Sequence, residues 1–189
     1  MLSLDKTFDE LSGQLSHPEL LNPARSDPFF YFVHSPAETV LLKQKIVVWS
    51  SALTNQGWKV ERLSLARELW KLVAESGRWE QWLSLEPNCE VQELNEAISD
   101  VLSSNNALIE SIAKHVSVER ERVIVLITET AALHPYFRVR SLESGLHNRA
   151  KVPTVLFYPG RRSGQYGLHF LDFYDFDGNY RATLLGGIE

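Results

Sequence analysis

The sequence predicts an α/β fold, a Rossmann-like and doubly wound sheet of mostly parallel strands with helices on both faces. Two runs of apolar residues without alternation, Val123–Ile127 and Pro153–Tyr158, are typical of strands that are buried on both sides. Strands and helices also alternate along the chain, as they do in β–α units. Near the C-terminus, Asp177-Gly178 predicts a tight turn, so we expect an antiparallel hairpin of residues 167–176 and 180–185 at the sheet edge.

The N-terminal segment, residues 1–27, predicts a short amphipathic helix followed by a loop around Pro18, Asn22 and Pro23. The helix carries apolar residues at helical spacing, namely Leu4, Phe8, Leu11 and Leu15. Phe29–Val33 then has the composition of a strand. After it, Ser35-Pro36-Ala37-Glu38 combines an N-cap serine, a first-turn proline and a capping glutamate, which predicts a helix start. We assign this helix the apolar positions Ala37, Val40, Leu41, Val48 and Ala52.

The middle of the chain predicts further β–α units. Trp58–Leu63 alternates as a strand does, and a helix follows from about residue 65 to 76. A helical pattern from about residue 91 to 116 is interrupted by the polar run Ser103–Asn106, which predicts a kink. A short helix from Tyr136 to about His147 leads into the second apolar strand.

Length and composition favour one ordinary globular domain. The chain has 189 residues, so we expect a single α/β domain over 1–189, with the N-terminal helix and loop in 1–27 and the sheet core in 28–189. The N-terminus lacks the basic and apolar regions of a secretory signal, and no apolar run approaches the length of a membrane span. We therefore expect a cytoplasmic protein.

Charge is distributed unevenly along the chain. The formal net charge of -5 argues against a protein whose whole surface binds nucleic acid. Residues 120–165 nevertheless hold eight Arg and Lys against three Glu. Six of these cations follow the Val123–Ile127 strand, near the expected carboxyl edge of the sheet, where guanidinium groups could bind carboxylates or phosphates. A solvated surface of mixed charge is the alternative interpretation.

Nucleotide hydrolysis is not supported by any motif. The apolar strand Val123–Ile127 is followed by an acidic residue, Glu129. In phosphate-loop ATPases an apolar strand likewise ends in a carboxylate, which organises the magnesium ion. However, neither G-x-x-x-x-G-K-[ST] nor G-x-G-x-x-G occurs, and the nearest approach, Gly160–Gly164, lacks the lysine. We therefore interpret Glu129 as an ordinary strand-end residue.

Metal and nucleophile patterns are equally incomplete. Asp172, Asp175 and Asp177 resemble a calcium loop in spacing but lack its flanking helices and distal glutamate. The single cysteine, Cys89, excludes an intrachain disulfide and a zinc site of several cysteines, and no G-x-S-x-G elbow is present. The sequence leaves open a pairing of that thiol in space with His115, His134 or His169. We expect no catalytic residue, no metal and no cofactor.

Several segments in the C-terminal half carry a family resemblance. They are His134–Leu142, Val152–Gly160, Gly164–Phe173 and Tyr180–Ala182. Together with the Pro28-Phe-Phe strand, the helix and the second strand, they resemble the BrxB family of BREX (bacteriophage exclusion) phage-resistance systems over roughly residues 25–185. The Tyr-Pro-Gly loop after the His-Pro-x-x-Arg segment is the most specific part of this resemblance.

The resemblance implies antiviral defence in concert with other proteins. It implies a PglZ-type partner of the alkaline-phosphatase superfamily and a site-specific adenine methyltransferase, with no enzymatic chemistry in the BrxB protein itself. The expected role is therefore that of a non-enzymatic adaptor that acts through protein–protein interaction. The alternative is a degenerate nucleotide- or DNA-phosphate-binding domain that uses a basic edge, and the two differ in the salt dependence of binding.

Seven residues form the candidate interaction surface. Four of them match family positions, namely His134, Arg138, Tyr158 and Gly160. The other three are the neighbouring cations Arg140, Arg161 and Arg162. Because Arg161 and Arg162 follow a Pro-Gly turn, we expect both at the tip of an exposed loop spanning Pro159–Gly167.

Overall fold

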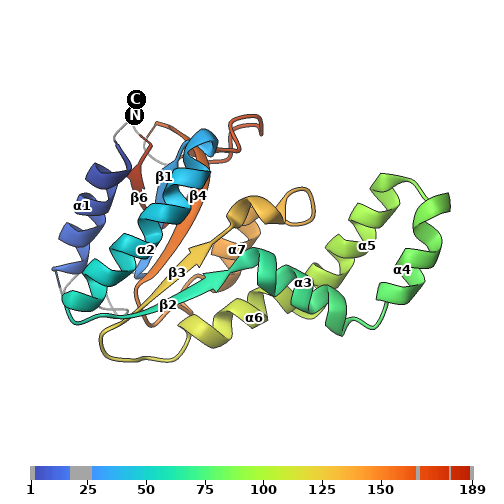
Figure 1. Ribbon diagram of the computed structural model, residues 1–189, viewed down its shortest axis with the longest axis horizontal. Coiled ribbons are helices and arrows are strands. Elements are labelled where there is room, and N and C mark those ends of the chain that lie inside the picture. Colours follow the sequence, from blue (N-terminus) through green and yellow to red (C-terminus); the bar gives the residue numbers. More distant parts are fainter. Residues whose placement is uncertain (1–2, 18–26, 165–166, 179, 188–189) are drawn as a thin grey trace.

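A computed structural model gives the fold and describes residues 3–17, 27–164, 167–178 and 180–187 (Figure 1). The strands are β1 (Phe29–His34), β2 (Lys59–Ser64), β3 (Val123–Thr128), β4 (Thr154–Ser163), β5 (Gly167–Phe170) and β6 (Thr183–Gly186). Parallel pairing gives the order β2-β3-β4-β1-β6, and β5 pairs antiparallel with the end of β4. The predicted α/β class, with a mostly parallel sheet, is confirmed.

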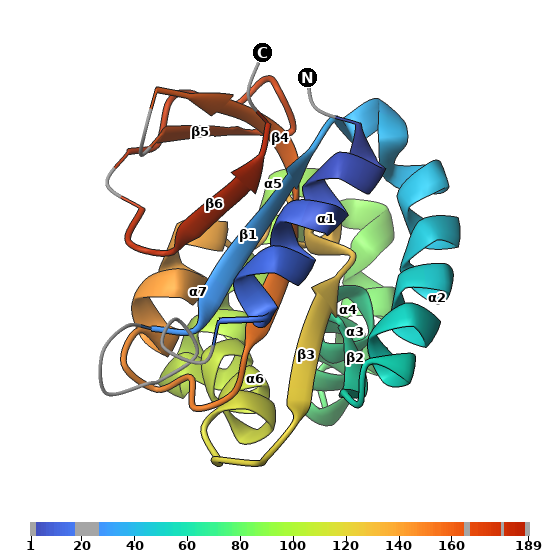
Figure 2. The ribbon, with the colours of Figure 1, turned by 90° about the vertical axis from the view of Figure 1, so that its left-hand side faces the viewer.

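Helices cover both faces of this sheet (Figure 2). On one face lie α1 (Leu4–Leu15) and α2 (Thr39–Asn55), and on the other lie α3 (Leu65–Glu75), α6 (Ala107–Val116) and α7 (Val139–Leu146). Successive side chains of a strand point to opposite faces. Accordingly, Phe30 and Phe32 of β1 pack in the core under α1 and α2, whereas Phe29 and Tyr31 pack in the other core. No helix in the described part of the chain is both long and apolar enough to span a membrane.

The N-terminal helix and the start of the second helix are as predicted. In α1, Leu4, Phe8, Leu11 and Leu15 are buried, and the loop expected around Pro18, Asn22 and Pro23 lies outside the described residues. Ser35 and Glu38 form the predicted capping box at η1 (Pro36–Glu38), which leads into α2.

The core-facing side of α2 differs from the prediction. The helix buries Leu42, Ile46, Trp49 and Leu53, whereas the assigned positions Val40, Leu41 and Val48 are exposed. The sequence of α2 has apolar residues on more than one side, so periodicity alone does not select the buried one. The observed choice places the indole of Trp49 against Phe8 and Phe32, and burying so large a ring contributes more than burying a valine.

Two helices that follow α3 project away from the sheet (Figure 1). They are α4 (Trp79–Leu85), which the sequence did not predict, and α5 (Val91–Ser103), and η2 (Glu86–Asn88) connects them. We call residues 79–103 the helical arm. The predicted kink is confirmed at η3 (Ser104–Asn106), where Asn105 and Asn106 have φ values of 52° and 55° before α6 begins.

The C-terminal strands pair differently from the prediction. The antiparallel hairpin is formed by β4 and β5, so Arg161 and Arg162 lie within β4, opposite His169 and Leu168, and not at a loop tip. Residues 180–185 do not pair with 167–176 as a hairpin arm, because β6 runs parallel to β1. This position gives β1 a partner on its open side and buries Leu185, which a solvated hairpin would not do.

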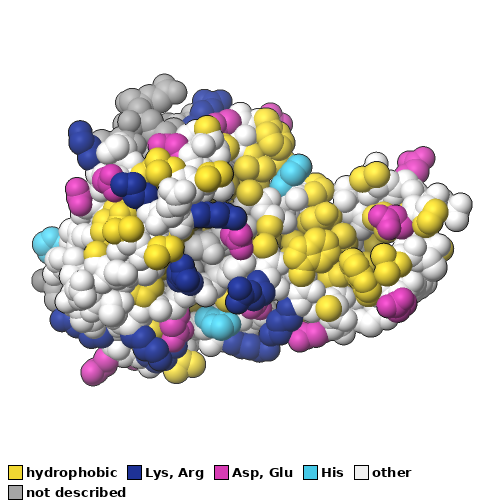
Figure 3. Space-filling view, viewed as in Figure 1, with side chains coloured by type: hydrophobic (Ala, Val, Ile, Leu, Met, Phe, Trp, Pro, Cys, Tyr) yellow, Lys and Arg dark blue, Asp and Glu magenta, His cyan; other side chains and the backbone are white. Residues whose placement is uncertain are grey.

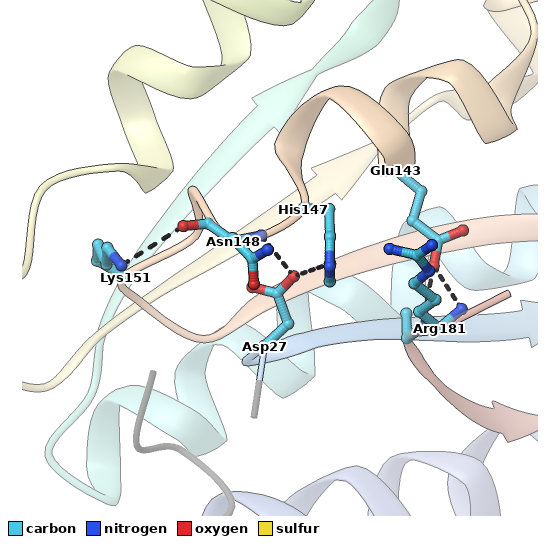
Figure 4. A network of polar contacts seen from close by, with 7 residues as sticks. Asp27, Glu143, His147, Asn148, Lys151 and Arg181 are labelled. Atoms are coloured by element: carbon cyan, nitrogen blue, oxygen red, sulfur yellow. Dashed lines mark hydrogen bonds and ion pairs between the residues drawn. The ribbon is translucent and has the colours of Figure 1, made fainter. Parts of the chain in front are cut away.

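Two carboxylates fasten α7 to the segments that lead into β1 and β6 (Figure 4). Asp27 lies two residues before β1, and its Oδ2 is 2.7 Å from His147 Nδ1 and 2.9 Å from the backbone nitrogen of Asn148. The buried Glu143 carboxylate accepts hydrogen bonds of 2.9 and 3.0 Å from the backbone amides of residues 181–182. These contacts fix both the C-terminal half of α7 and the approach to β6.

Candidate functional site

The segment 167–178, which begins with β5, holds several of the candidate residues in place. His134 hydrogen-bonds through Nδ1 to the hydroxyl of Tyr174. Arg140 Nη1 lies 2.5 Å from Asp177 Oδ1. Burial raises the pKa of Tyr174, and the nearby positive charge of Arg138 opposes that shift. Three candidates from the stretch around α7 therefore converge on this segment.

Exposed aromatic rings lie beside these residues. The His134 ring packs edge-on against Phe173 and Tyr174, at centroid distances of 5.4 and 5.2 Å, and those two rings stack at 4.8 Å. Phe173 is 65% exposed. Arg138, Arg140 and Asp177 line one shallow hollow next to α7. We call His134, Arg138, Arg140, Phe173 and Tyr174 the aromatic–arginine surface.

Tyr158 and Gly160 lie beneath the aromatic–arginine surface. Tyr158 is 1% exposed and packs against Phe170 at 5.3 Å, and its burial raises the pKa of its hydroxyl. A Cβ atom on Gly160 would lie 2.1 Å from the carbonyl oxygen of His169, so only glycine permits this approach of β5. Both residues thus position β5, and a partner would not contact Tyr158 directly.

The two arginines of β4 have different surroundings. Arg161 is exposed. Arg162 is half-buried, with Nε 3.2 Å from the Gly164 carbonyl oxygen and Nη1 3.4 Å from that of Leu184 in β6. Arg161 therefore offers its charge to solvent, whereas Arg162 connects the β4–β5 hairpin to β6.

The cations of residues 120–165 do not gather along one edge. Arg120 and Arg149 precede β3 and β4, which places them toward the amino ends of the strands. Each forms an ion pair of 2.7 Å, Arg120 with Glu61 and Arg149 with Glu110. The charge excess in the sequence is thus partly neutralised by acidic residues from other segments, and the expected basic carboxyl edge is smaller than the sequence suggested.

A cavity of about 340 Å³ opens at the carboxyl ends of β1 to β4, beneath α2. Its polar lining comprises His34, Lys43, Arg62, Ser64, Arg67 and Glu129 among others. Figure 3 shows Lys and Arg side chains around an acidic one between α2 and α3. The chain leaves β1 toward one face of the sheet and β2 and β3 toward the other, which is the topology at which open α/β sheets bind ligands. We call this cavity the carboxyl-edge pocket.

Glu129 lies at the centre of the polar contacts of this pocket. Its Oε1 is 2.9 Å from Lys43 Nζ, and its Oε2 accepts a hydrogen bond from Ser64. The Ser64 hydrogen bond, followed by that from Lys43, holds the pKa of Glu129 below its usual value. Ser64 also caps α3 by accepting from the backbone nitrogen of Arg67 at 3.1 Å. The residue interpreted from sequence as an ordinary strand end is therefore fixed by two other elements.

His34 supplies a neutral imidazole to the same pocket. It is 2% exposed, and its Nδ1 donates to the Ser35 carbonyl oxygen at 2.9 Å. Burial lowers the pKa of His34. The neutral ring then keeps Nε2 as an acceptor, while Lys43, Arg62 and Arg67 can attract an anion. Within the residues that the structure describes, no group of three His, Cys, Asp or Glu side chains could hold a metal ion.

A family model described as "BREX protein BrxB" matches residues 61–185. The chain belongs to the BrxB family. This BrxB protein is therefore a component of a BREX phage-defence system. The comparison with curated proteins and the comparison with solved structures gave no match.

The range that the family model matches includes all of one site of this BrxB protein and only part of the other. It contains the whole aromatic–arginine surface and the helical arm. It also contains Arg62, Ser64, Arg67 and Glu129 of the carboxyl-edge pocket, whereas His34 and Lys43 precede it. The sequence resemblance noted for residues 25–60 thus lies outside the range that the family model matches.

Proposed function

We propose that this BrxB protein is a non-enzymatic, cytoplasmic adaptor that links a PglZ-type protein to the adenine methyltransferase of its BREX system. Family membership supports a role within a defence system of several proteins. The observation that carries the proposal is the aromatic–arginine surface, in which exposed rings lie beside the exposed Arg138 and the half-buried Arg140.

This composition suits protein recognition. Aromatic residues and arginine are enriched at interfaces and dominate binding energies there, because a ring buries much area with few rotatable bonds. Phe173 is 65% exposed although it stacks on Tyr174, so water contacts one side of an already ordered ring pair. Covering that side would remove apolar area from water at little further entropic cost.

Co-purification tests the adaptor. A tagged wild-type chain, produced with the neighbouring BREX proteins and without added nucleotide, should retain the PglZ-type partner. The double variant Phe173→Ala/Tyr174→Ala should lose it, while Val48→Ala, an exposed apolar substitution on α2, should retain it. Repeated failure of the wild-type chain to retain the partner at low salt, or equal retention by the double variant, would argue against the proposal.

The carboxyl-edge pocket favours a second function, the binding of a phosphate-bearing small molecule. Three cations line this pocket against the single carboxylate of Glu129. Titration calorimetry with ATP and with inorganic phosphate tests it, using Arg62→Glu/Arg67→Glu as the variant.

If DNA is the ligand, affinity should fall by orders of magnitude between about 50 and 200 mM salt, whereas an apolar-centred protein interface should change far less.

The non-enzymatic part of the proposal has its own test. The purified protein should hydrolyse neither ATP nor GTP above background, because the chain has no phosphate-binding loop motif. Turnover that disappears in Glu129→Gln would contradict a purely binding role and would assign catalysis to the carboxyl-edge pocket.

A further inference from the structure

The helical arm carries charge of one sign only. Residues 79–103 contain six acidic residues and neither lysine nor arginine. The acidic residues are Glu80, Glu86, Glu90, Glu93, Glu96 and Asp100. The whole chain has a net charge of -5, so the arm accounts for its acidic character. A partner that approaches the arm therefore meets a concentrated negative field.

The same arm exposes large apolar side chains where it meets α3. Trp70 of α3 is 49% exposed and packs edge-on against Trp79 of α4 at 6.2 Å. Leu83 and Leu85 of α4 are also exposed. Figure 3 shows hydrophobic side chains gathered in one patch over α3 and the arm, with acidic side chains at its margin. Trp79 and Leu83 are four residues apart and so lie on one side of α4, and we call these two residues, with the adjacent Trp70 of α3, the apolar face of the arm.

These side chains contribute little to the core of the protein. Helix α4 has no fully buried side chain and α5 has only Leu102, and the two helices contact the core through the partly buried Trp82 and Ile98. Two helices of this length are marginal in water without packing on one face. The helices therefore use one side to pack on the core, and a contiguous group of large apolar side chains left exposed on another side is typical of a surface that a partner covers.

We propose that the apolar face of the arm binds a basic amphipathic helix of a partner protein. Apolar residues at positions i, i+3, i+4 and i+7 of that helix would cover Trp79 and Leu83, and its Lys and Arg residues would approach the acidic margin. A second copy of the chain fits less well, because its arm carries the same negative charge. An anionic membrane surface would likewise repel the arm. The inference deepens the adaptor proposal and rests on it, since an adaptor needs a second binding surface.

A peptide titration tests this inference without any BREX partner, so its failure is distinct from failure of the adaptor proposal. The probe is a synthetic helix of about 18 residues with Leu at helical spacing and Lys elsewhere. Fluorescence anisotropy should show that it binds the full-length protein, and that high salt weakens the binding. A scrambled peptide of the same composition should bind at least about tenfold more weakly, because its apolar residues share no face.

Variants of the arm locate the peptide-binding surface and separate the contribution of apolar contact from that of charge attraction. Trp79→Ala/Leu83→Ala should weaken peptide affinity at least about tenfold through lost apolar contact. Glu86→Lys, which leaves the Glu90–Glu93 capping box of α5 intact, should also weaken it, and with a smaller salt dependence. Val40→Ala/Val48→Ala on α2 is the matched control and should bind as the wild type does. Circular dichroism checks that each variant keeps its helix content.

The outcomes that overturn the inference are specific. Absence of binding, equal binding of the scrambled peptide, or unchanged affinity in Trp79→Ala/Leu83→Ala would each exclude a basic amphipathic helix as the occupant. Sedimentation velocity of the protein alone tests whether a second copy of the chain occupies the apolar face instead. Concentration-dependent dimers that disappear in the same variant would assign the apolar face to self-association instead.

Discussion

Arg140 Nη1 in α7 lies 2.5 Å from Oδ1 of Asp177, a residue 37 positions later in the chain. This ion pair fixes the segment after β5 to α7. Tyr174, in the same segment, is held by its hydrogen bond to His134. The aromatic–arginine surface is therefore produced by contacts between two distant stretches, and its shape depends on both.

The Arg140–Asp177 pair should stabilise the fold only slightly. Their side chains are 42% and 33% exposed, so solvent screens the attraction. A double-mutant cycle of Arg140→Ala and Asp177→Ala, measured by urea unfolding, should give a coupling energy below about 1 kcal/mol that decreases with salt. A coupling energy above about 2 kcal/mol would mean that the pair behaves as a buried one.

Glu143 should matter more to stability than its exposed neighbour in α7. Its buried carboxylate accepts hydrogen bonds from two backbone amides at residues 181–182. Glu143→Ala removes both acceptors and should cost about 1–3 kcal/mol of unfolding free energy, whereas Glu143→Gln retains an oxygen and should cost less. Ser144→Ala, at an exposed position of the same helix, is the control. Equal stability of the Ala and Gln variants would contradict this role.

Gly160 should tolerate no larger residue. A Cβ atom there would lie 2.1 Å from the His169 carbonyl oxygen, so Gly160→Ala should push β5 away and destabilise the protein by about 1–3 kcal/mol. Gly13→Ala is the matched control, because no atom lies within 4 Å of its added methyl group. In helix α1 that change should stabilise by about 0.5–1 kcal/mol. Thermal unfolding distinguishes them, and an unaltered melting temperature for Gly160→Ala would refute the proposed constraint.

Glu129 should make the stability of the fold depend on pH in the acidic range. Hydrogen bonds from Ser64 and then Lys43 hold the pKa of Glu129 below its ordinary value of 4.5. Folding therefore favours the ionised form, so its stabilisation is fully present above about pH 4.5 and is lost as pH falls through the lower folded pKa.

The measurement for Glu129 is the melting temperature of the wild type minus that of Glu129→Gln, as a function of pH. The difference should be largest near neutral pH and should shrink below about pH 4.5. Glu121→Gln removes one negative charge at an exposed position and serves as the control. A difference that stays constant, or grows on acidification, would show that the Ser64 and Lys43 contacts do not stabilise the ionised carboxylate.

Local signals predicted much of the fold. The runs Val123–Ile127 and Pro153–Tyr158 are buried strands of a parallel sheet, and the Ser35 capping box starts the second helix. Each of these features is specified by neighbours in sequence. Neighbours in sequence do not specify the buried side of α2 or the pairing of β6 with β1. Both depend on which distant surface offers more apolar area to bury.

In the aromatic–arginine surface and the carboxyl-edge pocket, too, some residues are predictable from local sequence and others are brought together only by the fold. The cations Arg138 and Arg140 are recognisable in the sequence, but Phe173 and Tyr174 join them only through the fold. Lys43 and Glu129 are separated by 86 residues, and no local pattern connects them. Two signals in the sequence pointed to the region of Glu129: the apolar strand Val123–Ile127 that ends beside it, and the general rule that ligands meet the carboxyl ends of parallel strands.

In the proposed adaptor, the aromatic–arginine surface binds the PglZ-type partner. The decisive measurement is the affinity of that purified protein for the wild type and for Arg138→Glu/Phe173→Ala, together with phage protection by each. Loss of a ring anchor and reversal of a charge should weaken binding by about a hundredfold or more and reduce protection, while the melting temperature stays nearly unchanged. Unchanged affinity and full protection in the folded variant would contradict the claim.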